Sequence, residues 1–251
     1  MNPLNRFIYY PMRYPEGDWF LQGRVGARDV RLRTADNVQI DGWWFAGRGS
    51  EVASLFLHGN AGNVTHRVDH ALAINKAGSS VLIIDYRGYG KSQGTPDEVG
   101  LYRDADAGYD WLVSSGFSPD MLVLHGESLG TAVATEVASR RRCAALVLES
   151  PFASLASMAN KVLPFIGGAF VHGFDTVSRI GNVRVPKLII HGEADEIVPI
   201  SQGRAVFNAA KQPKTFWPIR QAGHNDLLYA AGEEYARRLQ MLYQAATAQR
   251  R

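Results

Sequence analysis

The sequence predicts an α/β domain with a mostly parallel, doubly wound sheet of about eight strands. Short runs that are apolar on both faces recur along the chain, and such runs are typical of parallel strands buried on both sides. Stretches of helical length separate several of these runs, and a polar residue follows each apolar run. The runs are Ala53–Leu57, Val81–Ile84, Met121–Leu124, Ala145–Leu148 and Leu188–Ile190, and the helical stretches are Thr65–Ala77, Gly100–Val113 and Leu129–Arg140.

Two further strands precede the parallel runs. Val30–Thr34 and Val38–Phe45 flank the turn-prone residues 35–37, a pattern that predicts an antiparallel hairpin. No repeat, linker or low-complexity tract follows, so we expect a single domain over residues 26–251, preceded by an N-terminal arm over residues 1–25.

Composition excludes several classes of protein. Of the 251 residues, 46% are hydrophobic and 20% are charged, the balance of an ordinary globular protein. The net charge is only +3, and a nucleic-acid-binding protein would cluster basic residues beside a recognition motif, which is not seen. The lone cysteine, Cys143, excludes an internal disulfide, and we interpret it as a small residue leading into a strand rather than an activated thiolate. Nothing in the sequence indicates an oligomeric state.

The first 20 residues are rich in aromatic side chains, with Arg6 and Arg13 among them. Pro3, Pro11 and Pro15 oppose a helix, so an extended arm on the domain surface is favoured, with an interfacial membrane anchor as the alternative. No segment approaches the roughly 18 apolar residues of a membrane span, and no secretory signal is recognised. We therefore expect a cytoplasmic protein, with weak peripheral attachment to the membrane as an alternative.

The segment Gly126–Gly130 matches the pattern G-x-S-x-G of a nucleophile elbow. A buried run, Met121–Leu124, leads into it, and a helical stretch beginning at Leu129 leads out. Glycines allow the sharp strand-to-helix turn that lifts a serine hydroxyl above the sheet. Ser128 is therefore the candidate nucleophile.

A serine needs a base and an orienting acid, which should follow it in the order acid, then histidine. Asp195 is the predicted acid because it lies in the turn after the strand Leu188–Ile190, and Glu193, Glu196 and Glu149 are the alternatives. His224 is the predicted base, since it alone among the histidines follows Asp195.

Three further histidines, each before a glycine at a strand end, are expected to bond nearby backbone rather than to act in catalysis. They are His58, His125 and His191. No histidines and carboxylates fall at metal-ligand spacing, so we expect neither a metal nor a cofactor.

The oxyanion hole should combine the amide of the residue after the nucleophile with one from an earlier loop. The first is the amide of Leu129. The second should come from the glycine-containing loop His58–Asn63, where Asn60 is favoured and Ala61 is the alternative. The loop lacks the phosphate-binding motifs G-x-x-x-x-G-K-[ST] and G-x-G-x-x-G.

Together with Asp85–Ser92 and Glu149–Phe152, these motifs resemble the α/β-hydrolase superfamily over about residues 26–245. Within it they are most similar to the small-lid serine esterases and thioesterases, including the depalmitoylating α/β-hydrolase-domain proteins. The resemblance implies the α/β-hydrolase fold, a triad of Ser128, Asp195 and His224, and a structural role for Asp85–Ser92. It also implies an oxyanion hole at Asn60 and Leu129.

The interval from about residue 151 to 185 is too short for the large lid of many lipases. Its apolar side chains predict a short helical flap over an open, apolar-walled site. We expect a serine hydrolase that cleaves carboxylic ester or thioester bonds of a small-molecule or acylated substrate through an acyl-enzyme on Ser128. A serine peptidase of the same fold and a non-catalytic binding protein are the alternatives.

Overall fold

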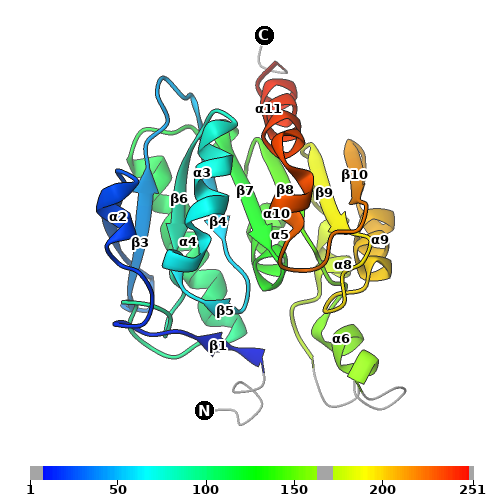
Figure 1. Cartoon of the computed structure of the whole chain (residues 1–251), viewed down its shortest axis with the longest axis horizontal. Coiled ribbons are helices and arrows are strands. Elements are labelled where there is room, and N and C mark those ends of the chain that lie inside the picture. Colours follow the sequence, from blue (N-terminus) through cyan, green and yellow to red (C-terminus); the bar gives the residue numbers. More distant parts are fainter. Residues whose placement is uncertain (1–7, 163–171, 249–251) are drawn as a thin grey trace.

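The computed structural model describes residues 8–162 and 172–248 (Figure 1). Its strands are β1 (Tyr10–Pro11), β2 (Arg28–Arg33), β3 (Gln39–Phe45), β4 (Val52–Leu57), β5 (Ala61–Gly62), β6 (Ser79–Ile84), β7 (Leu122–Glu127), β8 (Ala145–Glu149), β9 (Lys187–Gly192) and β10 (Lys214–Ile219). Its helices are α2 (Leu21–Arg24), α3 (Val68–Lys76), α4 (Glu98–Ser114), α5 (Leu129–Arg140), α6 (Leu155–Val162), α8 (Thr176–Ile180), α9 (Ile200–Ala209), α10 (Leu227–Ala231) and α11 (Glu233–Ala248). Two short 3₁₀ segments are η1 (Val64–Arg67) and η2 (Pro119–Met121).

The described residues form an eight-stranded sheet in the order β10-β9-β8-β7-β4-β6-β3-β2. The six strands from β10 to β6 are parallel neighbours, and the five predicted apolar runs fall on five of them, apart from Met121. The predicted hairpin is β2 with β3, which also pairs antiparallel with β6. The predicted fold class is thereby confirmed.

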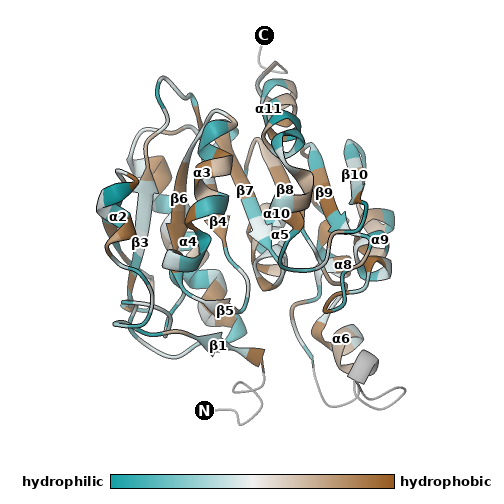
Figure 2. Ribbon diagram, in the orientation of Figure 1, coloured by the Kyte–Doolittle hydropathy of each residue, from teal (hydrophilic) through white to brown (hydrophobic). Residues whose placement is uncertain are grey.

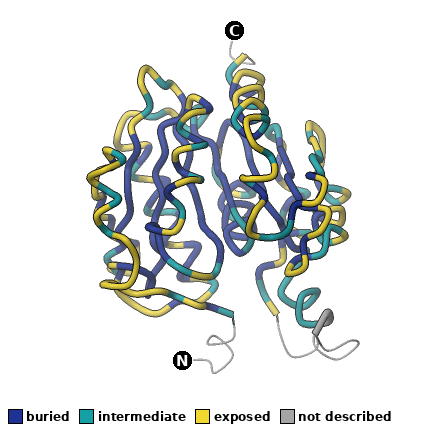
Figure 3. The backbone as a smooth tube through the Cα atoms, in the orientation of Figure 1, coloured by how far each residue is buried: buried dark blue, intermediate teal, exposed yellow. Residues whose placement is uncertain are grey.

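Each parallel strand contributes side chains to both faces of the sheet, as its continuous apolar run predicts. Leu55 and Leu57 of β4 join the core layer under α4 and α5, whereas Phe56 joins the layer under α3 and α11. The central strands β4, β6, β7, β8 and β9 are buried and largely hydrophobic, whereas polar residues lie on the outer surfaces of the helices and in the loops (Figures 2 and 3).

Two predicted boundaries shift for local reasons. The strand expected from Met121 begins one residue later, because Pro119–Met121 forms the 3₁₀ segment η2. The helix expected over Thr65–Ala77 is divided into η1 and α3, and Asn63 caps the first turn of η1 by accepting the Thr65 amide. α5 spans Leu129–Arg140 as predicted.

The carboxyl ends of the parallel strands point toward the end of the molecule that carries β1, β5 and α6 (Figure 1). The N-terminal segment is extended there, and β1 pairs with β5 in parallel register, Tyr10 opposite Ala61. Part of the predicted flap is helical, as α6 and α8, and residues 163–171 of the flap lie outside the described residues. None of the helices within the described ranges is both long and apolar enough to cross a membrane.

Candidate active site

Ser128 occupies the sharp turn between β7 and α5. Its backbone lies in the left-handed region, with φ of 50° and ψ of −114°, a strained conformation for a residue with a side chain. The flanking glycines permit this turn: a Cβ on Gly130 would lie 1.8 Å from the carbonyl oxygen of Leu57, and one on Gly126 would lie 2.4 Å from the carbonyl oxygen of Gly130. The elbow thus has the geometry that its sequence predicts.

The Ser128 hydroxyl lies at one end of a hydrogen-bonded chain. Its Oγ is 3.1 Å from Nε2 of His224, and Nδ1 of His224 is 2.8 Å from Oδ2 of Asp195. In this geometry the imidazole can accept the serine proton while the carboxylate fixes its tautomer and orientation. The structure therefore brings together the three residues that the sequence singles out, although they lie on three separate loops.

Asp195 is held from several sides. Its Oδ1 accepts the backbone amide hydrogens of Ile197, at 3.0 Å, and Val198, at 2.7 Å. Burial raises the pKa of Asp195, but the hydrogen bonds from His224 and Val198 outweigh burial and hold the pKa below its usual range. The carboxylate facing His224 is therefore ionised at neutral pH.

The alternative acids lie elsewhere. Glu193 and Glu196 are exposed, whereas Asp195 is buried. Glu149 is also buried, but its carboxylate contacts His125, His70 and Tyr235 instead of His224. This contact corrects one expectation: His125 was expected to bond nearby backbone, and its Nε2 lies 2.5 Å from Oε1 of Glu149 instead. Pairing of β7 with β8 sets His125 and Glu149 close together. The spacing of histidines along the sequence does not indicate which strands are neighbours.

The other two strand-end histidines bond to backbone, as expected. Nδ1 of His58 lies 2.7 Å from the carbonyl oxygen of Gly59, and Nε2 of His191 lies 2.8 Å from that of Val198. Burial lowers the pKa of His58 to about 4, so its ring is neutral at pH 7. Burial raises the pKa of the Cys143 thiol to about 12, which keeps this group protonated and unreactive.

The loop after β4 lies against the elbow. The backbone amide of Gly59 donates to Oε2 of Glu127, the residue before the nucleophile, at 3.3 Å. Among the described residues, no acceptor occupies the backbone amides of Asn60 or Leu129. Leu129 is the first residue of α5, where the helix dipole also favours a negative charge. Two free amides thus lie on the loop and the helix start where the sequence predicts an oxyanion hole.

One ion pair beside the nucleophile was missed by the sequence analysis. Nε of Arg67 donates to Oε2 of Glu127 at 2.6 Å, and Nη2 of Arg67 donates to the carbonyl oxygen of Ala61 at 3.3 Å. The position of Glu127 inside the elbow motif was a signal, but its partner comes from η1, 60 residues earlier. This pair ties the loop after β4 to the elbow.

A cleft of about 740 Å³ opens beside His224, between η1 and α10. Both charged and apolar side chains line its described walls, whereas the sequence predicts apolar walls. Four of the apolar flap residues on which that prediction rests, Leu163, Phe165, Ile166 and Phe170, lie outside the described residues. The lining includes Arg67, Glu127, Ser150, His224, Leu227 and Leu228. In residues 8–162 and 172–248, no group of three or more His, Cys, Asp and Glu side chains is placed to hold a metal ion.

The chain is similar in sequence to known proteins. A family model described as serine aminopeptidase, S33, matches residues 51–174. The protein Rv2307c of Mycobacterium tuberculosis is 39% identical over 226 residues, which cover 88% of this chain and 80% of that protein. The mouse α/β hydrolase domain-containing protein 17C is 34% identical over 195 residues, or 76% of this chain and 59% of the relative. The chain belongs to the α/β-hydrolase family.

Solved structures show the same fold in this family. The esterase Pf2001 of Pyrococcus furiosus superposes with a TM-score of 0.77, covering 95% of this chain and 98% of its own, at 24% identity. An α/β hydrolase from Vibrio vulnificus gives a TM-score of 0.80 at 21% identity, covering 96% of this chain and 94% of its own. The chain therefore shares the fold of these α/β-hydrolase structures.

Proposed function

We propose that this α/β hydrolase is a serine esterase or thioesterase that cleaves acyl substrates through a covalent acyl-enzyme on Ser128. The observation that carries the proposal is the chain from Ser128 through His224 to Asp195. The free amides of Leu129, the next residue, and of Asn60, on the loop bonded to Glu127, support it. An ester or thioester carbonyl requires a nucleophile, a base and an oxyanion hole, and each has a candidate here.

In the proposed reaction, Nε2 of His224 takes the proton of the Ser128 hydroxyl as the oxygen attacks the acyl carbon. The carbonyl oxygen becomes an oxyanion and accepts hydrogen bonds from the two amides. As the tetrahedral intermediate collapses, the bond to the alcohol or thiol breaks, and His224 returns the proton to the leaving group. Water then attacks the acyl-enzyme by the same route and releases the carboxylic acid.

Features around the triad support an acyl substrate. In α6, Leu155 and Met158 are partly buried and pack against the core, so part of the flap is apolar at the end of the sheet that holds the triad. The carboxylates of the cleft already have partners: Glu127 pairs with Arg67, and Glu149 contacts His70 and His125. A neutral acyl group would leave these pairs undisturbed.

A serine peptidase is the second candidate, because the matching family model is described as serine aminopeptidase. An aminopeptidase must pair the free amine of its substrate with a carboxylate, and here Glu127 is already paired with Arg67 and Glu149 already contacts His70. Turnover of aminoacyl-p-nitroanilides that exceeds turnover of esters would favour this candidate.

Labelling with a fluorophosphonate probe tests the assignment of the nucleophile. We expect the native protein to be labelled at Ser128, and Ser128→Ala to lose all labelling while its circular dichroism spectrum stays native. Ser115→Ala, which removes an exposed hydroxyl at the end of α4, serves as the control and should label normally. Full labelling of Ser128→Ala would refute the proposal.

A further inference from the structure

Every backbone carbonyl in the loop from His58 to Gly62 accepts a hydrogen bond. The donors come from four different parts of the chain. The carbonyl oxygen of His58 accepts from Tyr86 Oη at 3.1 Å, and that of Gly59 accepts from His58 Nδ1 at 2.7 Å. The carbonyl oxygen of Asn60 accepts from the amide of Tyr10 at 3.0 Å and from Tyr89 Oη at 2.8 Å. The carbonyl oxygen of Ala61 accepts from Arg67 Nη2 at 3.3 Å, and that of Gly62 accepts from the amide of Met12 at 3.1 Å. With its carbonyls engaged, the loop has little freedom to turn the amide of Asn60 away from the elbow.

The N-terminal arm supplies much of this restraint. Its backbone amides at Tyr10 and Met12 donate to Asn60 and Gly62, and β1 lies parallel to β5. In addition, the side-chain Nδ2 of Asn60 donates to the carbonyl oxygen of Ile8 at 2.9 Å. Asn60 is thus bonded to the arm through both its backbone and its side chain.

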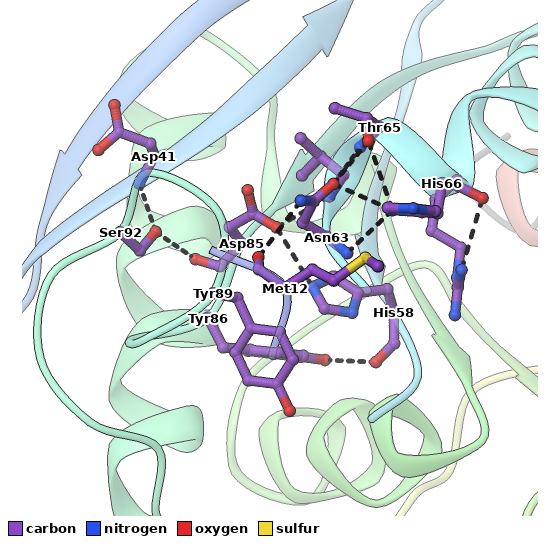
Figure 4. Close-up of polar contacts among 12 residues, drawn as sticks. Met12, Asp41, His58, Asn63, Thr65, His66, Asp85, Tyr86, Tyr89 and Ser92 are labelled. Carbon is purple, nitrogen blue, oxygen red and sulfur yellow. Dashed lines mark hydrogen bonds and ion pairs between the residues drawn. The ribbon is translucent and has the colours of Figure 1, made fainter. Parts of the chain in front are cut away.

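The arm is itself held in place. The ring of Tyr9 is 5% exposed and makes an edge contact with Phe174, with ring centroids 6.4 Å apart. The carbonyl oxygen of Met12 accepts hydrogen bonds from the amide of Gly90, at 2.9 Å, and from Nδ2 of Asn63, at 3.3 Å. Figure 4 shows Met12 beside Asn63, with Tyr86 extending toward His58. Residues 8–12 are therefore held to the domain by backbone hydrogen bonds and by the buried Tyr9, although the side chains of Tyr10 and Met12 are exposed.

From this geometry we propose that residues 8–12 of the arm are a positioning element for the oxyanion hole. The inference rests on the proposed function, because it assigns the amide of Asn60 to that hole. An oxyanion hole accelerates a reaction only if its donors are fixed before charge develops, and a displacement of about 1 Å costs up to about 100-fold in rate. The arm touches no reacting atom. It acts through Asn60.

Two truncated proteins separate the arm from the residues before it. Removing residues 1–7 keeps every contact described above, whereas removing residues 1–11 deletes the bonds that Ile8 and Tyr10 make to Asn60. For p-nitrophenyl butyrate hydrolysis, we expect the shorter truncation to keep the native kcat. We expect the longer one to lose about 10- to 100-fold in kcat with KM changed by less than about 3-fold, because the lost restraint acts on the transition state.

Point variants test the same restraint in the full chain. Asn60→Ala keeps the backbone amide but loses the bond to Ile8, and Tyr89→Phe loses the hydroxyl that supports the Asn60 carbonyl. Each should lower kcat more than it changes KM, and both should keep their melting temperature within a few degrees of native. Tyr109→Phe removes a hydroxyl that bonds the carbonyl oxygen of Arg142, far from the loop, and is the control.

The outcomes separate the two proposals. If the native protein shows Ser128-dependent turnover and the two truncations have equal kcat, the positioning role is overturned and the proposed function stands. If labelling and turnover of the native protein do not depend on Ser128, the proposed function itself fails. If the longer truncation does not fold, Asn60→Ala decides, and a native kcat in that variant overturns the inference.

Discussion

Oδ2 of Asp195 lies 2.8 Å from Nδ1 of His224, while Oδ1 of the same carboxylate accepts the backbone amide hydrogens of Ile197 and Val198. The backbone of the turn after β9 therefore fixes the carboxylate, and the carboxylate fixes the imidazole. Substituting asparagine for Asp195 would remove the charge of the side chain while keeping its shape.

Asp195→Asn should keep the fold and lose up to about 10⁴-fold in kcat, because an amide stabilises the wrong tautomer of His224. The rate of p-nitrophenyl ester hydrolysis measures this loss. Glu193→Gln is the matched control, since Glu193 lies on the same turn but is exposed. Near-native turnover in Asp195→Asn would move the acid to another carboxylate.

The buried carboxylate of Glu149 supports the sheet and α11 together. It contacts His125 and His70, and it accepts a hydrogen bond from the hydroxyl of Tyr235 at 2.5 Å. Burial raises the pKa of Glu149, but these partners outweigh burial and hold the pKa far below its usual range. The carboxylate of Glu149 is therefore ionised, and its ionisation in this buried site depends on these partners.

Glu149→Gln should lower the free energy of unfolding by about 3–5 kcal/mol, because it weakens the hydrogen bonds from His125 and Tyr235 to the carboxylate, each worth about 1.5–3 kcal/mol. Urea denaturation at pH 7 measures the change. Tyr235→Phe should cost less, about 1–3 kcal/mol, since it removes one hydrogen bond. Tyr229→Phe, at a residue that is 89% exposed, should have no measurable effect. Equal stability of Glu149→Gln and the native protein would show that the network contributes nothing.

Asp85 introduces a pH dependence of stability. Burial raises the pKa of its carboxyl to about 8, although the Val64 amide donates to Oδ1 at 2.8 Å and opposes the shift. In the unfolded chain an aspartate titrates near pH 3.9, so the folded protein holds an extra proton between these two values. The contribution to stability is full below about pH 4 and is lost as the pH rises through about 8.

Asp85→Asn should therefore remove part of the decline in unfolding free energy between pH 5 and pH 9, because an amide can still accept from Val64 but cannot ionise. Urea denaturation at the two pH values measures the decline. Asp69→Asn, at an exposed position on α3, is the control and should keep the native decline. An unchanged decline in Asp85→Asn would place the titrating group elsewhere.

Local patterns in the sequence were sufficient to predict the parallel strands and to single out the three side chains that the structure brings together at the turn after β7. Each buried strand is a continuous apolar run, and Gly126 and Gly130 flank Ser128 because no larger side chain fits there. Chain order alone selected His224, since it is the histidine after Asp195.

Contacts between distant segments could not be predicted from these patterns. The bonds of Asn60 to the arm, of Glu127 to Arg67 and of Glu149 to His125 each join residues at least 24 positions apart. Nothing in the spacing of these residues indicates which element lies opposite. The arm is extended at Tyr10–Pro11, whereas Leu21–Arg24 within the predicted arm forms the helix α2. The proline content gave no sign that Tyr9 is buried.

Hydrolysis of p-nitrophenyl esters from acetyl to palmitoyl, by the native protein and by Ser128→Ala, tests the central claim most directly. We predict turnover by the native protein on at least one ester and none above background in Ser128→Ala, with the best chain length reporting the size of the acyl site. Equal turnover by the two proteins would contradict an acyl-enzyme on Ser128.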